Sequence, residues 1–147
     1  MGGFSSHGFL KIQLVEGNLN SQAYIGILQA TLIPNLNAIF PQGGFFQQDN
    51  APIHTSKQTR AFLLQNNIQV MDWPALSPDM NPIENVWAEI SRKLDREKIA
   101  NSNELFIKIS EIWENLMSNP TYSMSLIDSM PKRVIAMIES KGGSTKY

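Results

Sequence analysis

Apolar and polar residues follow two different periods in the first part of the chain. Within residues 9–15, Leu10, Ile12 and Leu14 recur at a period of two and so share one face, which predicts a strand. Over residues 20–33 the apolar side chains recur at three- and four-residue spacing, which predicts a helix that Pro34 discourages from continuing. The beginning of the chain is therefore expected to combine strands with helices.

Further short elements follow before the middle of the chain. Residues 45–48 and 68–71 are short segments bounded by Gly, Asn and Asp, and each predicts a short strand. Thr55 with Gln58 three positions later matches a capping box, which predicts that a helix begins at Thr55. Residues 73–80 contain two prolines and are expected to form a loop.

After Asn81 the pattern is helical. Two apolar stripes at helical spacing are formed first by Ile83, Val86, Trp87, Ile90 and Leu94, and then by Leu105, Ile109, Ile112, Trp113 and Leu116. Pro131 is expected in the first turn of a last helix whose C-cap is formed by residues 142–143. The whole pattern predicts an α/β fold with a helical C-terminal half.

Composition excludes several classes of protein. With 42% hydrophobic and 17% charged residues over 147 positions, the chain is long and apolar enough to bury a core. It has no cysteine, which excludes disulfides and cysteine-based zinc sites. No apolar run approaches the roughly 20 residues that span a bilayer, so no membrane partner is expected and the protein is expected to be intracellular, not secreted. The net charge of −1 lacks the basic excess typical of nucleic-acid binders.

Two carboxylates lie at junctions suited to a metal site. Asp49 directly follows the strand predicted over residues 45–48, and the carboxyl end of such a strand faces the crevice where α/β folds bind ligands. Glu84 lies in the first turn of the helix that Asn81 and Pro82 are predicted to begin. Carboxylate oxygens hold Mg²⁺ or Mn²⁺, and two such ions can activate water for phosphodiester cleavage. Asp49 and Glu84 are therefore candidate metal ligands and catalytic residues.

Ordinary structural roles account for the same residues. Asn at the N-cap, Pro at the first helical position and Glu84 at the third form a standard helix start. Asp49 opens an Asp-Asn-Ala-Pro sequence that is typical of a turn. His54 lies close enough in sequence to approach a metal or a phosphate, but a histidine without a catalytic role at the start of a helix is the simpler interpretation. These patterns alone do not establish a nuclease.

A basic cluster follows the Glu84 helix. It consists of Arg92, Lys93, Arg96 and Lys98, interspersed with Glu89, Asp95 and Glu97. Lys57 and Arg60 are likewise candidates for phosphate contacts or simply solvated side chains. The mixture of signs in the cluster favours a solvated, salt-bridged helix over a DNA-binding surface.

Two longer motifs resemble a known family. QQDNAPIHTSK (residues 47–57) and WPALSPDMNPIENVW (residues 73–87) are similar to the catalytic core of Tc/mariner-type transposases, DDE superfamily endonucleases, of the Tc branch. The separation of 84 − 49 = 35 positions, with 34 residues between, is that branch's spacing. GGFSSHG near the start and SMPKRVIAMIESKGGSTKY (residues 129–147) at the end also resemble the family, so the resemblance covers essentially the whole chain.

This resemblance implies a ribonuclease-H-like fold and a two-metal site of two aspartates and one glutamate. Such an enzyme cuts transposon ends and joins the 3′-hydroxyl to target DNA, which implies DNA as partner, Mg²⁺ or Mn²⁺ as cofactor and the nucleus as location. Matched residue by residue, Asp49 corresponds to the second aspartate and Glu84 to the glutamate. The first aspartate has no counterpart, because it belongs upstream of GGFSSHG, and Glu16, the only acidic residue before Asp49, lies in a different motif.

The resemblance therefore predicts that residues 1–147 form a single, partial, N-terminally truncated DDE transposase catalytic domain. The first strand of the ribonuclease-H-like sheet and the helix-turn-helix DNA-binding module would be absent, and the latter would account for the missing basic charge. The strand over residues 9–15 would keep an unpaired edge, which predicts marginal stability, self-association or another polypeptide that supplies the missing strand.

With one of three carboxylates missing, the chain alone is expected to be inactive. The resemblance leaves two other readings open. One is a repurposed, non-catalytic DNA- or protein-binding module, and the other is a decayed element without function.

Overall fold

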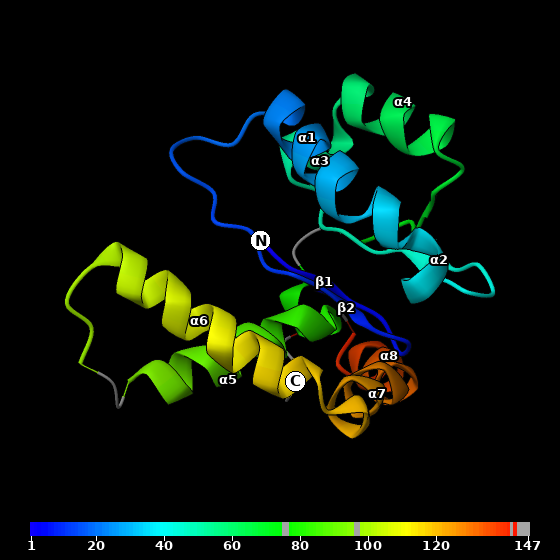
Figure 1. Ribbon diagram of the computed structural model, residues 1–147. Helices are drawn as coiled ribbons and strands as arrows, with labels where there is room; N and C mark the ends of the chain where they lie inside the picture. The colour runs from blue at the N-terminus through cyan, green and yellow to red at the C-terminus, as the bar shows by residue number, and fades with distance from the viewer. Residues whose placement is uncertain (75–76, 96–97, 142, 144–147) are drawn as a thin grey trace. The chain divides into compact units, whose positions relative to one another are not determined.

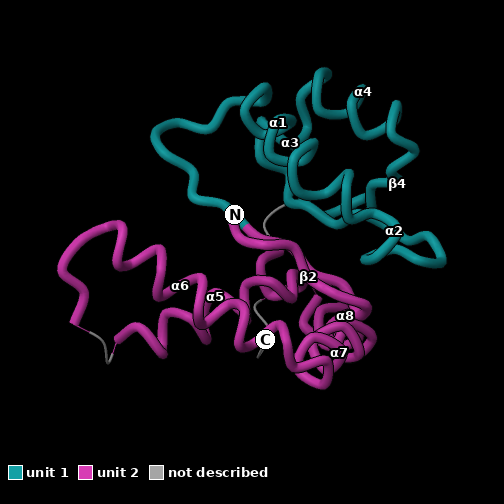
Figure 2. The backbone as a smooth tube through the Cα atoms, in the orientation of Figure 1, with its two compact units in different colours: residues 1, 13–76 teal, residues 2–12, 77–147 magenta. Residues whose placement is uncertain are grey.

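The computed structural model describes residues 1–74, 77–95, 98–141 and 143. The chain divides into two compact units, one comprising residue 1 and residues 13–76 and the other residues 2–12 and 77–147 (Figure 2). In chain order the elements are β1 (Gly3–Phe4), β2 (Phe9–Leu10), α1 (Ser21–Thr31), η1 (Ile33–Asn35), α2 (Leu36–Ile39), β3 (Phe45–Phe46), α3 (Pro52–Thr55), α4 (Lys57–Gln65), β4 (Gln69–Val70), η2 (Pro78–Met80), α5 (Pro82–Leu94), α6 (Ser102–Met117), α7 (Pro120–Asp128) and α8 (Met130–Glu139) (Figure 1). The predicted mixture of strands and helices, with a helical C-terminal half, is confirmed.

Helix α1 organises the first unit. Its N-cap is Asn20, whose side chain accepts a hydrogen bond from the Ala23 N–H at 2.9 Å. The helix packs against α3 and α4, and the buried apolar residues of this unit are Tyr24, Leu28, Leu32, Ile39 and Leu63. The expectation that helical structure stops at Pro34 is wrong in part, because Pro34 lies within the 3₁₀ turn η1, from which α2 continues. A proline near the start of a helical turn loses nothing by lacking an N–H.

The predicted helix start at Thr55 is also wrong. Pro52 begins a separate short helix, α3, and the Thr55 hydroxyl donates to the Ala51 carbonyl at 3.2 Å inside it. The N-cap of α4 is Ser56, whose Oγ accepts from the Thr59 N–H at 3.2 Å. Ser56 and not the adjacent Thr55 caps α4, because Pro52 starts a separate helix upstream that includes Thr55.

The strands are shorter than predicted. β3 and β4 pair in parallel, with Phe45 opposite Gln69 and Phe46 opposite Val70. β1 and β2 pair antiparallel, with Gly3 opposite Leu10. Among the described residues each of these four strands pairs with a single neighbouring strand, so each has an edge without a strand partner.

The second unit is built around Trp113. Helices α5 and α6 lie side by side and run in opposite directions (Figure 1), and the two predicted apolar stripes meet in a core of Val86, Ile90, Trp113 and Met117. The Trp113 ring stacks on Trp87 with centroids 5.4 Å apart, and its Nε1 donates to the Leu10 carbonyl at 3.0 Å. A Cβ on Gly2 would lie 2.9 Å from the Trp113 ring, so only glycine lets the first strand approach the indole so closely.

The last helix begins as predicted but ends differently. Pro131 lies in the first turn of α8. The helix ends at Glu139, and Lys141, with φ of 52°, takes the left-handed conformation that glycine was expected to provide. Gly142, part of the predicted C-cap, lies outside the described residues. No helix formed by the described residues is long and apolar enough to cross a membrane.

Replacement of Trp113 tests the organisation of the second unit. Trp113→Ala removes a fully buried ring, its stacking on Trp87 and its hydrogen bond to the hairpin. The expected loss in the free energy of unfolding is about 3–5 kcal/mol, measured by urea denaturation. Ile107→Ala on the same helix is the control, because Ile107 is 56% exposed. A loss no larger than that of the control would contradict the role given to Trp113.

Candidate active site

The Asp49 carboxylate lies in the loop between β3 and α3. Its Oδ1 accepts a hydrogen bond from the Ala51 N–H at 3.0 Å, so the turn expected from the sequence is present. The same oxygen lies 2.6 Å from Nδ1 of His54. Because 62% of the Asp49 side chain remains exposed, the carboxylate is both held in place and accessible to a cation.

His54 is held on two sides. It lies on α3, its side chain is only 16% exposed, and its ring packs against Tyr24 with centroids 4.4 Å apart. When Asp49 is ionised, the short contact requires the proton on Nδ1, which leaves Nε2 of a neutral imidazole as an acceptor. The expectation that His54 merely marks the start of a helix misses this contact with the candidate carboxylate.

Tyr24 and Gln48 complete the surroundings of Asp49. The Tyr24 hydroxyl donates to Gln48 Oε1 at 2.8 Å, and Gln48 Nε2 donates to the His54 carbonyl at 3.3 Å. Burial, and secondarily the nearby charge of Asp49, raises the pKa of Tyr24 well above its ordinary value, so the hydroxyl remains a donor. The sequence showed Tyr24 only as an apolar position of α1, although a buried tyrosine hydroxyl generally needs a partner.

Glu84 is the third residue of α5 and is exposed. In a capping box its carboxylate would accept from the Asn81 N–H, but that N–H donates to the Pro78 carbonyl at 2.9 Å. The Asn81 side-chain amide instead donates to Glu84 Oε1 at 3.4 Å. Asn81 and Pro82 therefore begin the helix as predicted. The contact between Asn81 and Glu84 runs through the Asn81 side-chain amide, and the Asn81 N–H is bound to the Pro78 carbonyl.

The two candidate carboxylates belong to different units, Asp49 to the first and Glu84 to the second. Among the described residues no group of three or more His, Asp and Glu side chains is arranged to hold a metal ion. Glu16 is an exposed residue between β2 and α1.

The basic cluster after Glu84 forms ion pairs with its own helix. Arg92 makes two hydrogen bonds to Glu89, at 2.7 and 2.8 Å, and the Lys93 ammonium lies 3.6 Å from the same carboxylate. The Arg92 hydrogen bonds hold the pKa of Glu89 below its ordinary value. The predicted salt-bridged helix is confirmed for these residues, while Arg96 and Glu97 lie outside the described part of the chain.

Two variants of Asp49 separate its role in the turn from its charge. Asp49→Asn keeps an oxygen for the Ala51 N–H, so the free energy of unfolding should change by less than about 0.5 kcal/mol. Asp49→Ala removes that acceptor and should cost about 1 kcal/mol. Urea denaturation of both variants measures the difference, and equal stability would show that the turn does not depend on the side chain.

Comparisons of the sequence with protein families and with curated proteins all match this chain to DDE endonucleases and transposases. The family model described as DDE superfamily endonuclease matches residues 1–106. The Tcb1 transposase of Caenorhabditis briggsae is 34% identical over 146 residues, which cover 99% of this chain and 53% of that protein. The Tc1 transposase of Caenorhabditis elegans is 33% identical with the same coverage. The chain thus spans about half the length of the curated relatives it matches.

Solved structures show the same fold. The Mos1 transposase catalytic domain, solved with raltegravir and Mg, superposes with a TM-score of 0.84 at 20% identity, over 99% of this chain and 75% of that one. The Mos1 transposase paired-end complex with the left transposon end gives a TM-score of 0.82 at 26% identity, over 99% of this chain and 43% of that one. This chain belongs to the DDE superfamily endonucleases, and its relatives within that family are Tc/mariner transposases.

Proposed function

We propose that this chain is the part of a Tc/mariner-type transposase catalytic domain that supplies two metal-binding carboxylates, Asp49 and Glu84, for cleavage and joining of DNA. The observation that carries the proposal is the state of Asp49, whose carboxylate is exposed yet oriented by His54 and by the Ala51 N–H. Both carboxylates lie within the residues that match the family model.

The donor chemistry fits Mg²⁺ or Mn²⁺. Both ions prefer carboxylate oxygens, and both candidate carboxylates are exposed. Bound there, such ions would supply Lewis-acid stabilisation and an activated water for phosphodiester cleavage. The Mos1 catalytic domain has been solved with Mg and with Mn, which supports divalent metals as the cofactor.

The residues around the metal ligands have separate tasks in this proposal. Asp49 binds as the ionised carboxylate, and His54 keeps its Oδ1 in one orientation by donating from Nδ1. Tyr24 and Gln48 hold His54 and the adjacent backbone so that this orientation persists. Preorganised ligands lose less conformational freedom when a metal binds.

DNA is the proposed substrate and partner, and the nucleus the proposed location. The curated relatives are transposases of transposable elements, and Mos1 forms a paired-end complex with a transposon end. The reaction we infer for the parent enzyme is cutting of transposon DNA followed by joining of its 3′-hydroxyl to a target.

We further propose that these 147 residues do not cleave DNA alone. Glu16 is the only acidic residue before Asp49, and it lies in a different motif from the one that carries the family's first aspartate, so the chain offers two of the family's three carboxylates. The one-sided pairing of every described strand supports a partial ribonuclease-H-like sheet. Open strand edges in turn favour self-association or pairing with another polypeptide.

Metal titration tests the carboxylate pair. The wild-type chain should bind Mn²⁺ by calorimetry, and Asp49→Asn and Glu84→Gln should each weaken binding at least about tenfold. Asp128→Asn, at an exposed position on α7, is the matched control and should leave binding unchanged. Equal Mn²⁺ affinity in an Asp49→Asn/Glu84→Gln double variant would disprove the proposed site.

A nicking assay on supercoiled DNA with Mn²⁺ tests the proposed inactivity. No cleavage is expected from the folded wild-type chain. Cleavage that disappears in the double variant would show that two carboxylates of this chain suffice, and the inactivity proposal would be wrong. Salt-dependent DNA binding without Mn²⁺ binding or cleavage would favour the non-catalytic binding module instead.

A further inference from the structure

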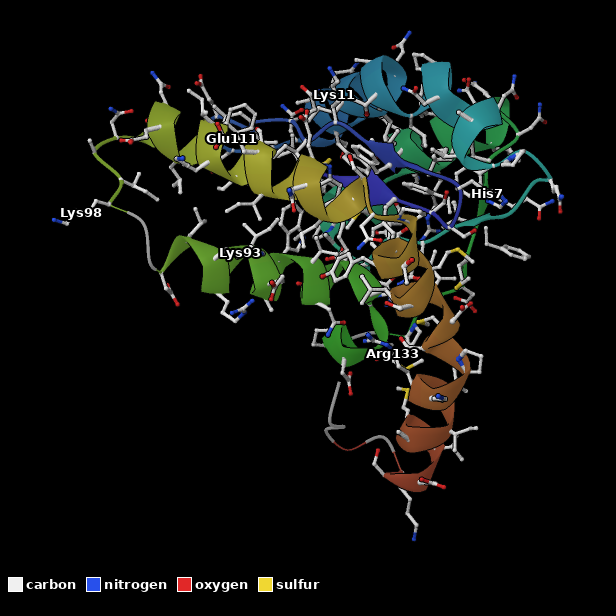
Figure 3. The ribbon with its side chains drawn as sticks, turned by 60° about the horizontal axis from the view of Figure 1, so that its bottom comes forward. His7, Lys11, Lys93, Lys98, Glu111 and Arg133 are labelled. Carbon is white, nitrogen blue, oxygen red and sulfur yellow. The ribbon has the colours of Figure 1, made fainter. Side chains whose placement is uncertain are left out.

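A buried arginine connects the last helix to the segment that carries Glu84. Arg133 lies on α8 (Figure 3), and it is buried, with only 2% exposed. Its Nη1 donates to the Asp79 carbonyl at 2.7 Å, its Nη2 to Asn85 Oδ1 at 2.7 Å, and its Nε to Ser129 Oγ at 2.8 Å. Burial of a guanidinium is costly unless its donors are satisfied. Conformations of residues 79–85 that keep these hydrogen bonds to Arg133 are therefore strongly favoured over conformations that break them.

Two of these contacts bracket Glu84. Asp79 lies in the turn η2, before α5, and Asn85 lies in the first turn of α5, immediately after Glu84. A planar guanidinium presents its donors in a fixed fork, so it fixes the spacing of the two acceptors as well as binding each one. Arg133 thus ties together both ends of residues 79–85.

Burial holds the first turn of α5 at Pro82, whereas Glu84 in the same turn is exposed. The N-terminal N–H groups of a helix lack partners inside the helix, and Pro82 has no N–H at all. The buried positions Val86 and Ile90 anchor the helix further along, whereas the Glu84 side chain is exposed and packing does not set its direction. Holding the Asn85 side chain fixes the rotation of this turn about the helix axis, and with it the direction of Glu84.

We propose that Arg133 is a positioning residue for Glu84, acting through the Asp79 carbonyl and the Asn85 side chain. The inference rests on the proposed function of Glu84 as a metal ligand. Arg133 touches neither the metal nor the substrate in this account. It orders the turn that presents the carboxylate.

The third contact of Arg133 provides a matched control. Ser129 Oγ accepts from Nε and donates to the Leu126 carbonyl at 2.6 Å, so it connects Arg133 to the end of α7 and not to residues 79–85. Ser129→Ala removes one hydrogen bond from the same buried guanidinium. A purely structural arginine would make Ser129→Ala and Asn85→Ala equivalent, whereas a positioning role makes them differ.

Mn²⁺ titration of the full chain distinguishes the two roles. Asn85→Ala and Arg133→Lys should each weaken Mn²⁺ binding about tenfold, since lysine keeps the charge but cannot bridge two acceptors. Ser129→Ala should bind as wild type does. The inference is overturned if Asn85→Ala binds Mn²⁺ like the wild type, or if Ser129→Ala loses as much affinity. If Arg133→Lys fails to fold, the comparison of Mn²⁺ affinity between Asn85→Ala and Ser129→Ala still tests the positioning role.

Amide hydrogen exchange separates this inference from the proposed function. The amides of residues 83–86 should lose protection in Asn85→Ala and not in Ser129→Ala, while the amides near the end of α5 stay protected in both. If the wild-type chain binds no Mn²⁺, the proposed function fails, and the exchange pattern alone decides whether Arg133 orders the turn. Unchanged protection of residues 83–86 in Asn85→Ala would overturn the inference.

Discussion

A carboxylate that is proposed to take up a cation from solution has to be accessible, and packing does little to fix the direction of an exposed side chain. In the first unit, the largely buried imidazole of His54 and the Ala51 N–H both contact Oδ1 of Asp49. His54 in turn rests against the buried Tyr24 ring. The buried Tyr24 ring of α1 thus holds His54, and His54 together with the Ala51 N–H orients the exposed Asp49 carboxylate.

The second unit meets the same constraint in another way. The Asn81 side-chain amide donates to Glu84 Oε1 at a long 3.4 Å, and the helix turn that carries Glu84 is held by the Arg133 guanidinium, from the opposite end of the unit's chain. A charged group can serve there because its hydrogen bonds replace the water it loses. Fixing the backbone turn is an alternative to fixing the carboxylate itself.

Trp113 plays a comparable organising part for the hairpin. Its indole N–H binds the Leu10 carbonyl, and its ring occupies the space left open by Gly2 and covered by Trp87. The hairpin β1–β2 is too short to be stable alone, since two-stranded ribbons are marginal in water. Phe4 and Phe9 of the hairpin pack against the core cluster of α5 and α6, and Trp113 adds a side chain that combines apolar area with a hydrogen-bond donor.

The sequence by itself determined the features that depend on neighbours in the chain. Hydrophobic period located the longer helices α1, α5 and α6, and prolines and asparagines marked helix beginnings. Two motifs, whose acidic residues Asp49 and Glu84 are 35 positions apart, indicated the family and made these two residues the candidate ligands. The sequence pattern predicts Thr55 as the N-cap where the structure has Ser56, because the end of α3 and the start of α4 are adjacent in the sequence.

Only the tertiary structure decided which distant residues meet. The lengths of the strands depend on the partner strand, and no periodic pattern encodes the pairing of Tyr24 with Gln48 or of Arg133 with Asp79, 54 positions apart. A buried polar side chain takes whichever partner the packed core brings within hydrogen-bonding distance, so its role follows from the fold and not from its position in the sequence.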